Sequence, residues 1–328
     1  GVPQAALQLL HGPGETVGAA LVAQSGVAGV VFTGSTQVAK IIQRALAMKD
    51  GPIVPLIAET GGINAMLVDS SALPEQVIDA VVMSDFRSAG QRCSALRLLC
   101  VHEGIADGVI EMLQGAAKEL KVGDPSELST DVGPVIDAEA YDNIQRHITR
   151  LKSDAKELVG AGMSVQFAQV KEESAQRAGY TEQNALASTR EGVVANLIAP
   201  HAFEVASIAD VRAEIFGPVL QVVRWSGEPG DVIAQINALG YGLTLGIQTR
   251  IDSRALAMAH AAHVGNVYIN RNMIGAVVGV QPFGGEGLSG TGPKAGGPHY
   301  LYRFCAEQTV TINTAAAGGN AALLAAQH

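Results

Sequence analysis

The sequence predicts an α/β fold in which strands and helices alternate along 328 residues. Short apolar or β-branched runs end repeatedly in glycine, and stretches of helical periodicity follow them. Hydrophobic residues make up 48% of the chain and charged residues 16%, enough apolar material for a substantial core. The 38 glycines fit the tight turns and close backbone approaches of α/β enzymes.

The first sixty residues predict a β-turn-α unit. Residues 6–10 and 27–35 are strand-like, and residues 53–62 form a further strand after a Gly-Pro break. The helix predicted over 36–46 is based on one shared face, which consists of Val38, Ile41, Ile42, Ala45 and Leu46.

The middle of the chain predicts a helix, a loop and a strand in succession. The helix starts near residues 71–74 and ends before Gly90. Residues 91–94 follow as a loop, and the apolar run 95–102 is a strand with Cys100 buried inside it. Cys93 is therefore expected at a helix-to-strand junction.

The remaining elements follow the same patterns. Helices are predicted over 105–120 and 138–151, and strands over 219–225 and 264–270. We interpret the poorly patterned stretch 160–191 as partly exposed, and the glycine-rich stretch 275–297 as mostly loop. Alternating threonines predict a last strand over 309–314, before a tail of small residues.

Charge and cysteine content exclude several functions. A net charge of −9 without a basic cluster argues against a nucleic-acid partner. No apolar run approaches the roughly 20 residues of a membrane span, and no leader pattern opens the chain, so we expect a cytoplasmic protein. The 3 cysteines lack paired spacing, which favours reduced thiols over disulfides, zinc or any other metal site.

Two residues carry reactive chemistry. Cys93 lies in a loop beside Arg92, a cation that we expect to lower its pKa and favour the nucleophilic thiolate. Glu59 ends an apolar strand before Thr60-Gly61-Gly62, at the sheet edge where ligands of α/β folds bind. Taken singly, they also fit an ordinary loop cysteine and a solvated strand-end charge.

Weaker signals surround them. Gly34-Ser35 joins a strand to a helix start and offers amides to a phosphate, although Ser35 also fits an ordinary helix cap. "EIFGPVL" at 214–220 has no specific task on physical grounds alone. The glycines of "QPFGGEGLSGTG" allow backbone to approach a ligand, or form a flexible turn.

Together, "FTGS", "ETGG", "GQRC", "EIFGPV" and "PFGGEGLSG" in this order resemble the aldehyde dehydrogenase superfamily. "SAGQRCSALRLLCV" and the segment 264–303 resemble the L-glutamate γ-semialdehyde (pyrroline-5-carboxylate) dehydrogenase domain of bacterial proline utilization A. The resemblance implies the later part of a Rossmann-like NAD-binding domain at 1–61, an α/β catalytic domain at 62–288, and a return segment with an oligomerisation strand at 289–328.

The resemblance also implies the roles of residues. Cys93 is the nucleophile that forms a thiohemiacetal and then a thioester, its amide is one oxyanion donor, and Glu59 is the base for hydrolysis. Cofactor contacts fall on Phe32, Gly34, Ser35, Val38, Gly61, Glu214 and Phe216. Substrate contacts fall on Ser94, Gly275, Ala276 and Phe283, with the amides of the glycine loop at a carboxylate. We interpret Arg92 as an anchor of the cysteine loop.

The chain departs from the family at its start. The second oxyanion donor, a ribose-binding lysine, an aromatic residue of the aldehyde pocket and the first strands have no counterpart here, so we expect weak or no turnover from these residues alone. An interrupted sheet would expose a strand edge. The resemblance further implies a homo-oligomer, membership of a larger bifunctional polypeptide, and FAD only in an upstream proline dehydrogenase domain.

Three alternatives stay open. The first is a non-catalytic assembly domain of this fold, which has no reason to retain both Glu59 and Cys93. The second is a dehydrogenase of another aldehyde, which the loop 271–281 would decide. The third is a cysteine hydrolase, which would need a histidine partner in a comparably distinctive motif.

Overall fold

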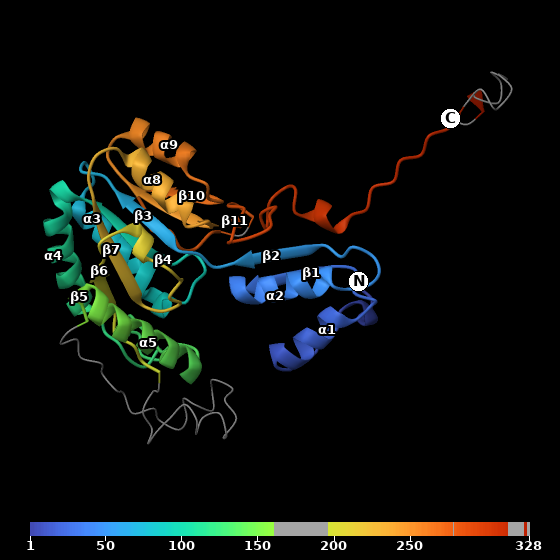
Figure 1. The fold of residues 1–328 in the computed structure, drawn as a ribbon, viewed down its shortest axis with the longest axis horizontal. Coiled ribbons are helices and arrows are strands. Elements are labelled where there is room, and N and C mark those ends of the chain that lie inside the picture. Colours follow the sequence, from blue (N-terminus) through green and yellow to red (C-terminus); the bar gives the residue numbers. More distant parts are fainter. Residues whose placement is uncertain (161–195, 278, 314–324, 327–328) are drawn as a thin grey trace.

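The computed structural model describes residues 1–160, 196–277, 279–313 and 325–326. They form a large seven-stranded unit and a smaller two-stranded unit beside it (Figure 1). The predicted α/β class is confirmed, because six neighbouring strands of the large sheet run parallel and helices separate most of them along the chain.

The smaller unit contains the first elements of the chain. Its sheet pairs β1 (Val30–Gly34) in parallel with β2 (Leu56–Thr60), and α1 (Ala19–Ala23) and α2 (Thr36–Ala47) accompany it. The expected strand over 6–10 is wrong: these exposed residues have no neighbouring strand to pair with among the described residues. Val38 and Ile41 of the predicted helical face are also exposed, and only Ala39 and Leu46 of α2 are buried.

The large sheet has the order β10-β9-β3-β4-β7-β6-β5, in which β5 alone is antiparallel to its neighbour. Its strands are β3 (Asn64–Val68), β4 (Leu96–His102), β5 (Lys156–Val159), β6 (His201–Glu204), β7 (Val219–Trp225), β9 (Thr244–Gln248) and β10 (Asn266–Ile269). A short pair, β8 (Tyr241–Gly242) and β11 (Glu286–Gly287), interrupts the glycine-rich loop, which is otherwise irregular as expected.

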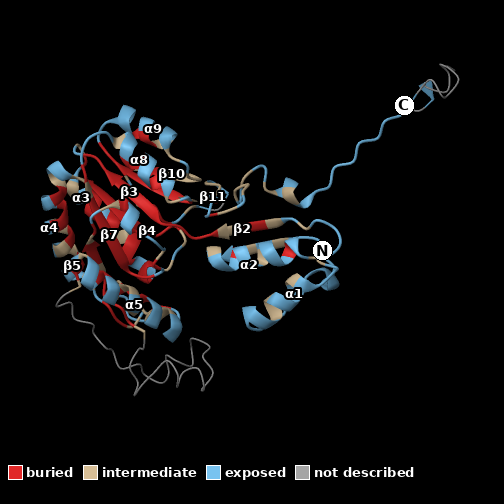
Figure 2. Cartoon of the chain, viewed as in Figure 1, coloured by how far each residue is buried: buried red, intermediate tan, exposed pale blue. Residues whose placement is uncertain are grey.

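Helices pack against this sheet. They are α3 (Pro74–Val81), α4 (Glu103–Glu119), α5 (Ala138–Asp154), α8 (Pro229–Ala238) and α9 (Asp252–Ala261). α4 packs on β4 and β7, α5 on β5 and β6, and α9 on β9. Their buried faces and the central strands form one apolar core, shown in red in Figure 2.

The junction before β4 is more complex than the sequence predicted. α3 starts at Pro74 and ends at Val81, within the predicted range 71–74 and before Gly90 as predicted, but a π-helical turn (Val82–Phe86) and a 3-10 turn (Arg87–Gly90) follow it. Ser88, Ala89 and Gly90 all have positive φ angles of 51–65°. Three left-handed residues in succession turn the chain sharply into the cysteine loop.

Two predictions concern the later segments. Residues 161–195, which include most of the poorly patterned stretch, lie outside the described residues. Residues 309–313 are exposed and form no strand within this single chain, and Thr314 lies outside the described part. The predicted oligomerisation strand stays a prediction, because its pairing needs a second chain.

Candidate active site

The candidate site lies where the two units meet. Glu59 is near the carboxyl end of β2, whereas Asn64, Leu96 and Thr244 mark the amino ends of three strands of the large sheet. The connection from β2 to β3 is only residues 61–63. The fold therefore brings the ends of the small sheet to the amino edge of the large one.

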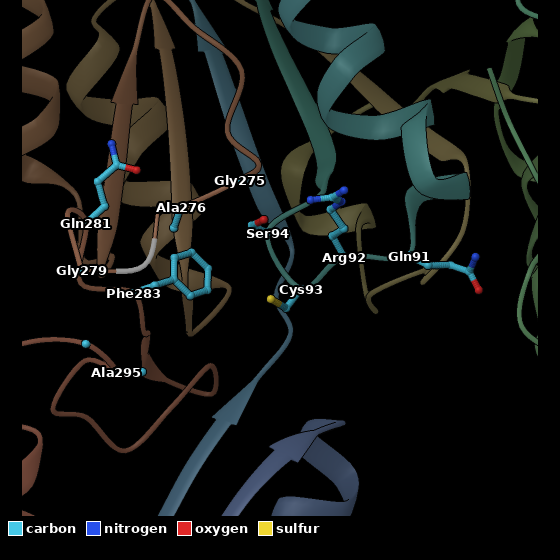
Figure 3. A pocket seen from close by; sticks show the side chains of 11 residues that line it. Gln91, Arg92, Cys93, Ser94, Gly275, Ala276, Gly279, Gln281, Phe283 and Ala295 are labelled. Atoms are coloured by element: carbon cyan, nitrogen blue, oxygen red, sulfur yellow. The ribbon is translucent and has the colours of Figure 1, made fainter. Parts of the chain in front are cut away.

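A pocket of about 510 Å³ opens around Cys93. The predicted substrate residues Ser94, Gly275, Ala276 and Phe283 all line it, together with Gln91, Arg92, Gly279, Gln281, Ala295 and Gly296. In Figure 3 the sulfur of Cys93 points toward the ring of Phe283. The structure thus gathers the predicted nucleophile and all four predicted substrate residues in one cavity.

The Arg92 side chain does not activate the thiol as expected. Its Nε donates to Ser88 Oγ at 3.1 Å, and in Figure 3 the side chain points away from the sulfur. Burial raises the pKa of Cys93, N–H groups of Ser94 and Cys93 that bond to the sulfur lower it, and the charges of Glu214 and Glu59 raise it. The expected lowering of this pKa by Arg92 is therefore wrong, and oriented amides are the groups that favour the thiolate.

Glu59 lies beside the pocket rather than in its lining. Its Oε2 accepts a hydrogen bond from the Gly285 amide at 3.1 Å, and its Oε1 is buried without a hydrogen-bond partner. Burial raises the pKa of Glu59 to about 7, against the lowering effects of the Gly285 amide and the Lys294 ammonium. A carboxyl that titrates near neutral pH is suited to exchange protons with water.

Glu214 lies beside Gly61, a residue of the connection between β2 and β3. Its carboxylate forms an ion pair with Arg97 at 3.7 Å, and burial raises its pKa. A Cβ on Gly61 would lie 2.1 Å from Glu214 Oε2, so this close approach requires a glycine there. Phe216 is 46% exposed and stacks on the Arg97 guanidinium.

The remaining predicted cofactor residues surround the amino end of α2. Gly34, Ser35 and Val38 are exposed and Phe32 is half-buried. Ser35 caps the helix by accepting a hydrogen bond from the Val38 amide at 3.2 Å, as its ordinary interpretation predicted. This cap engages only the Val38 amide. The other amides of the first helical turn have no intrahelical partner, so the start of the helix can still bind an anion.

Sequence reasoning missed Arg97, although a signal was present. Arg97 is a charged residue inside the apolar run "LRLLCV", and such a residue needs partners when it is buried. It is 1% exposed and donates to the carbonyls of Gly217 and Arg92, at 3.1 and 3.3 Å. It therefore joins the cysteine loop to the segment of Glu214 and Phe216.

Gln91 and Asn64 were also missed. Gln91 lines the pocket, but its side chain bonds to Pro134 O and to the Ile136 amide and so anchors the cysteine loop to another segment. Asn64 donates to the backbone carbonyls of Cys93 and Ala95. No spacing rule in the sequence marks these amides, because their partners are backbone atoms of distant residues.

Comparison with known proteins decides the family. The model of the aldehyde dehydrogenase family matches residues 1–310. The chain belongs to the aldehyde dehydrogenase family. The bifunctional protein PutA of Escherichia coli K12 is 52% identical over 94% of this chain, which covers 22% of that protein.

Other members of the family agree. The 1-pyrroline-5-carboxylate dehydrogenase of Geobacillus thermodenitrificans is 33% identical over 95% of this chain and 56% of its own length. A crystal structure of a Bradyrhizobium japonicum proline utilization A mutant matches with a TM-score of 0.82 and 56% identity, over 97% of this chain and 30% of that one. A Thermus 1-pyrroline-5-carboxylate dehydrogenase with bound NAD matches with a TM-score of 0.75 and 33% identity, over 89% and 52%. The chain thus spans between about a fifth and just over half of these relatives.

None of the helices in the described ranges is both long and apolar enough to cross a bilayer. Within the same ranges, no three His, Cys, Asp or Glu side chains come together in a way that could hold a metal ion.

Proposed function

We propose that this chain carries the NAD-dependent oxidation of L-glutamate γ-semialdehyde to L-glutamate in proline catabolism, within a larger bifunctional polypeptide. The observation that carries the proposal is that Cys93 lines the pocket while Glu59 lies close enough for its charge to raise the pKa of Cys93, and burial raises the pKa of Glu59 itself to about 7. The relatives with PutA and 1-pyrroline-5-carboxylate dehydrogenase names support the same reaction.

Cys93 acts as the nucleophile. The N–H groups of Ser94 and Cys93 that bond to its sulfur favour the thiolate, which attacks the aldehyde carbon and forms a thiohemiacetal. The developing negative charge lies on the former aldehyde oxygen, next to the Cys93 amide. A fixed donor at such a position contributes roughly 3 kcal/mol to transition-state stabilisation.

Glu59 acts in the second half of the reaction. Its buried, unpartnered Oε1 is an acceptor for a proton of the water that attacks the acyl group on Cys93. The Gly285 amide holds the other carboxylate oxygen and orients the side chain. Hydrolysis releases the acid and returns the sulfur of Cys93.

The residues around the two units fit NAD. The exposed amino end of α2, with Gly34 and Ser35, suits a pyrophosphate, and Phe32 and Val38 offer apolar surface beside it. Glu214, buried against Gly61, presents a carboxylate for ribose hydroxyls, and the exposed ring of Phe216 lies next to it. Bound NAD would supply the hydride acceptor.

The pocket fits a small substrate that bears a carboxylate. Its volume of about 510 Å³ is ample for glutamate semialdehyde. Gly275 has a φ of +77°, a left-handed conformation that turns the backbone of the loop at the pocket wall. Ser94 and the Gly275-Ala276 backbone supply uncharged donors for the carboxylate, and Phe283 supplies an apolar wall for the carbon chain.

The experiment is Cys93→Ala in the full-length natural polypeptide and in residues 1–328 alone. We expect oxidation of glutamate semialdehyde, followed as NADH formation, to vanish while NAD binding stays nearly unchanged. Retained oxidation would contradict the proposal.

Equal efficiencies of the unmodified enzyme on glutamate semialdehyde and on propanal would defeat the substrate assignment alone. Residues 1–328 are expected to turn over weakly or not at all, and a normal specific activity would overturn that expectation.

The assembly remains part of the proposal. Residues 309–314 would pair with a neighbouring subunit, which makes the protein a homo-oligomer. A proline dehydrogenase domain with FAD would lie elsewhere in the bifunctional polypeptide. The mass of the full-length protein in solution, before and after truncation at residue 308, tests the first of these statements.

A further inference from the structure

Asn64 contacts the backbone of the cysteine loop, at Cys93 and Ala95. It begins β3, is 2% exposed, and uses its whole side-chain carboxamide on backbone groups. Nδ2 donates to Cys93 O at 2.7 Å and to Ala95 O at 2.8 Å, and Oδ1 accepts from the Thr244 amide at 3.2 Å. One side chain thereby joins the nucleophile loop to β3 and β9.

The chemistry of these partners fixes the orientation of the carboxamide. If the amide were flipped, Oδ1 would face two carbonyl oxygens and Nδ2 would face an N–H group. Each of the three contacts would then become repulsive or unsatisfied, at a buried position where unsatisfied groups are costly. Asn64 therefore holds the Cys93 carbonyl in one direction.

The direction of that carbonyl determines what the sulfur contacts. Cys93 O and the Ser94 amide belong to the same planar trans peptide, in which C=O and N–H point in opposite directions. The carbonyl points into the sheet toward Asn64, and the Ser94 N–H bonds to the Cys93 sulfur. We propose that Asn64 is a positioning residue, which fixes the 93–94 peptide so that the Ser94 amide is aimed at the sulfur and stabilises the thiolate.

Neighbouring contacts support other parts of the loop. Arg97 donates to Arg92 O at 3.3 Å, and Thr244 Oγ1 donates to Ser94 O at 3.5 Å. Neither contact engages the 93–94 peptide itself. The role of Asn64 in thiol reactivity is therefore separable from the general rigidity of the loop.

The inference rests on Cys93 as the proposed nucleophile, but its test needs neither aldehyde nor NAD. The rate of alkylation by iodoacetamide is measured on residues 1–328 from pH 6 up to the pH at which the Cys93 profile levels off, because burial raises the pKa of this thiol above its ordinary value. Peptide-resolved mass spectrometry separates Cys93 from the buried Cys100 and the exposed Cys305. Asn64→Ala removes the amide, and Asn64→Leu removes it while retaining most of the volume.

We expect both variants to raise the midpoint of the Cys93 profile by about one pH unit, which makes alkylation at pH 7 about tenfold slower, with an unchanged plateau at high pH. A residue that only held the loop in shape would change the plateau, through access to the sulfur, and leave the midpoint in place. An unchanged midpoint in a folded variant overturns the proposal.

Gln248→Ala is the matched control. Gln248 is a buried amide at the opposite end of β9, 1% exposed, and donates to Arg271 O. We expect this variant to lose stability without moving the Cys93 midpoint, and an equal shift would contradict the assignment to Asn64. In the unmodified chain, the ¹⁵N shift of the Ser94 amide should titrate with the midpoint of Cys93, and its failure to do so overturns the proposal even if neither Asn64 variant folds.

The two proposals fail in different ways. Absence of dehydrogenase turnover in the full-length polypeptide, with a shifted alkylation midpoint, would remove the proposed function and leave the Asn64 clamp intact. Normal turnover with an unshifted midpoint would remove the clamp and leave the enzyme.

Discussion

The two units of the molecule bury their residues to very different extents (Figure 2). All five residues of β3 are buried, whereas all five residues of β1 are half-buried or exposed. The large unit places Cys93 at the edge of a dense core, and the small unit carries Glu59 and the proposed contacts to the pyrophosphate of NAD. Cys93, the proposed nucleophile, therefore lies against the densely packed unit, whereas Glu59 belongs to the less buried one.

Hydrogen bonds to residues 288–291 hold Glu59 in place. The Thr60 amide donates to Ser289 O at 3.0 Å, Thr60 Oγ1 donates to Leu288 O at 2.6 Å, and the Thr291 amide donates to Ala58 O at 2.9 Å. The far edge of β2 is thus bound by a segment that comes more than two hundred residues later. The position of Glu59, the proposed base, therefore depends on residues 288–291 as well as on its own sheet.

The largest expected effect concerns that base. Glu59→Gln should lower turnover of the full-length enzyme by about a hundredfold or more, the usual contribution of a positioned base. Because burial raises the pKa of Glu59 to about 7, the unmodified rate should rise from pH 6 to 8 as the carboxyl loses its proton. Steady-state rates across this range test both points, and a rising limb that survives in the variant would contradict the role of Glu59.

The same shift predicts a sign for stability. The folded pKa of about 7 lies above the ordinary value of 4.5, so the folded state holds this proton more tightly than the unfolded chain. The contribution of Glu59 to stability is present below about pH 4.5 and is lost as the pH rises toward 7. The urea unfolding midpoint of the unmodified chain should therefore fall between about pH 4.5 and pH 7 by an amount that Glu59→Gln does not show.

A pair of strand substitutions, one buried and one exposed, measures the difference between the units. Leu99→Ala in β4, at a side chain that is 0% exposed, should cost about 3 kcal/mol of unfolding free energy. Val31→Ala in β1, at 57% exposure, should cost less than about 0.5 kcal/mol. Urea unfolding with separate probes for each unit tests this, and equal costs would abolish the distinction.

Two glycines give a smaller contrast of the same kind. Gly90 has a φ of +65°, and a Cβ there would lie 2.2 Å from Gly217 O, a backbone atom within the core. Gly90→Ala should therefore cost about 2 kcal/mol and displace the cysteine loop. At Gly34 the added Cβ meets the end of the Phe32 ring, which can move at the surface, so Gly34→Ala should cost less than about 1 kcal/mol. Thermal melts of both variants compare the two sites, and a larger loss at Gly34 would contradict the interpretation.

The sequence predicted best where burial is dense. β7 was predicted over 219–225 with the bounds that the structure has, and Cys100 was expected to be buried and is 0% exposed. The hydrophobic pattern predicts such strands well because each residue of a buried strand packs against neighbouring side chains. In the small unit the same reasoning predicted a strand over 6–10 that does not form and assigned Val38 and Ile41 to a helical face that is exposed.

The candidate site was only partly predictable. Motifs identified Cys93, Glu59 and the pocket loop, because reactive side chains and glycines stand out in a sequence. They did not predict the electrostatics: adjacency suggested that Arg92 lowers the pKa of Cys93, but its side chain bonds to Ser88 instead. Adjacency in sequence does not determine side-chain direction, and the amides of Asn64 and Gln91 act on backbone atoms that no motif encodes.

The smallest expected effect connects the two units through one cation. Lys294 donates to Gly265 O in the large unit, and its ammonium lowers the pKa of Glu59 in the small one. Lys294→Met removes that charge, so the pKa of Glu59 should rise and the rising limb of the rate profile should move to higher pH by less than about one unit. Lys118→Met, at an exposed lysine in the last turn of α4, is the charge-matched control and should leave the limb in place. A limb that moves to lower pH in Lys294→Met would contradict the sign of this coupling. A shift that is equal in both variants would mean that net charge, rather than proximity to Glu59, controls the base.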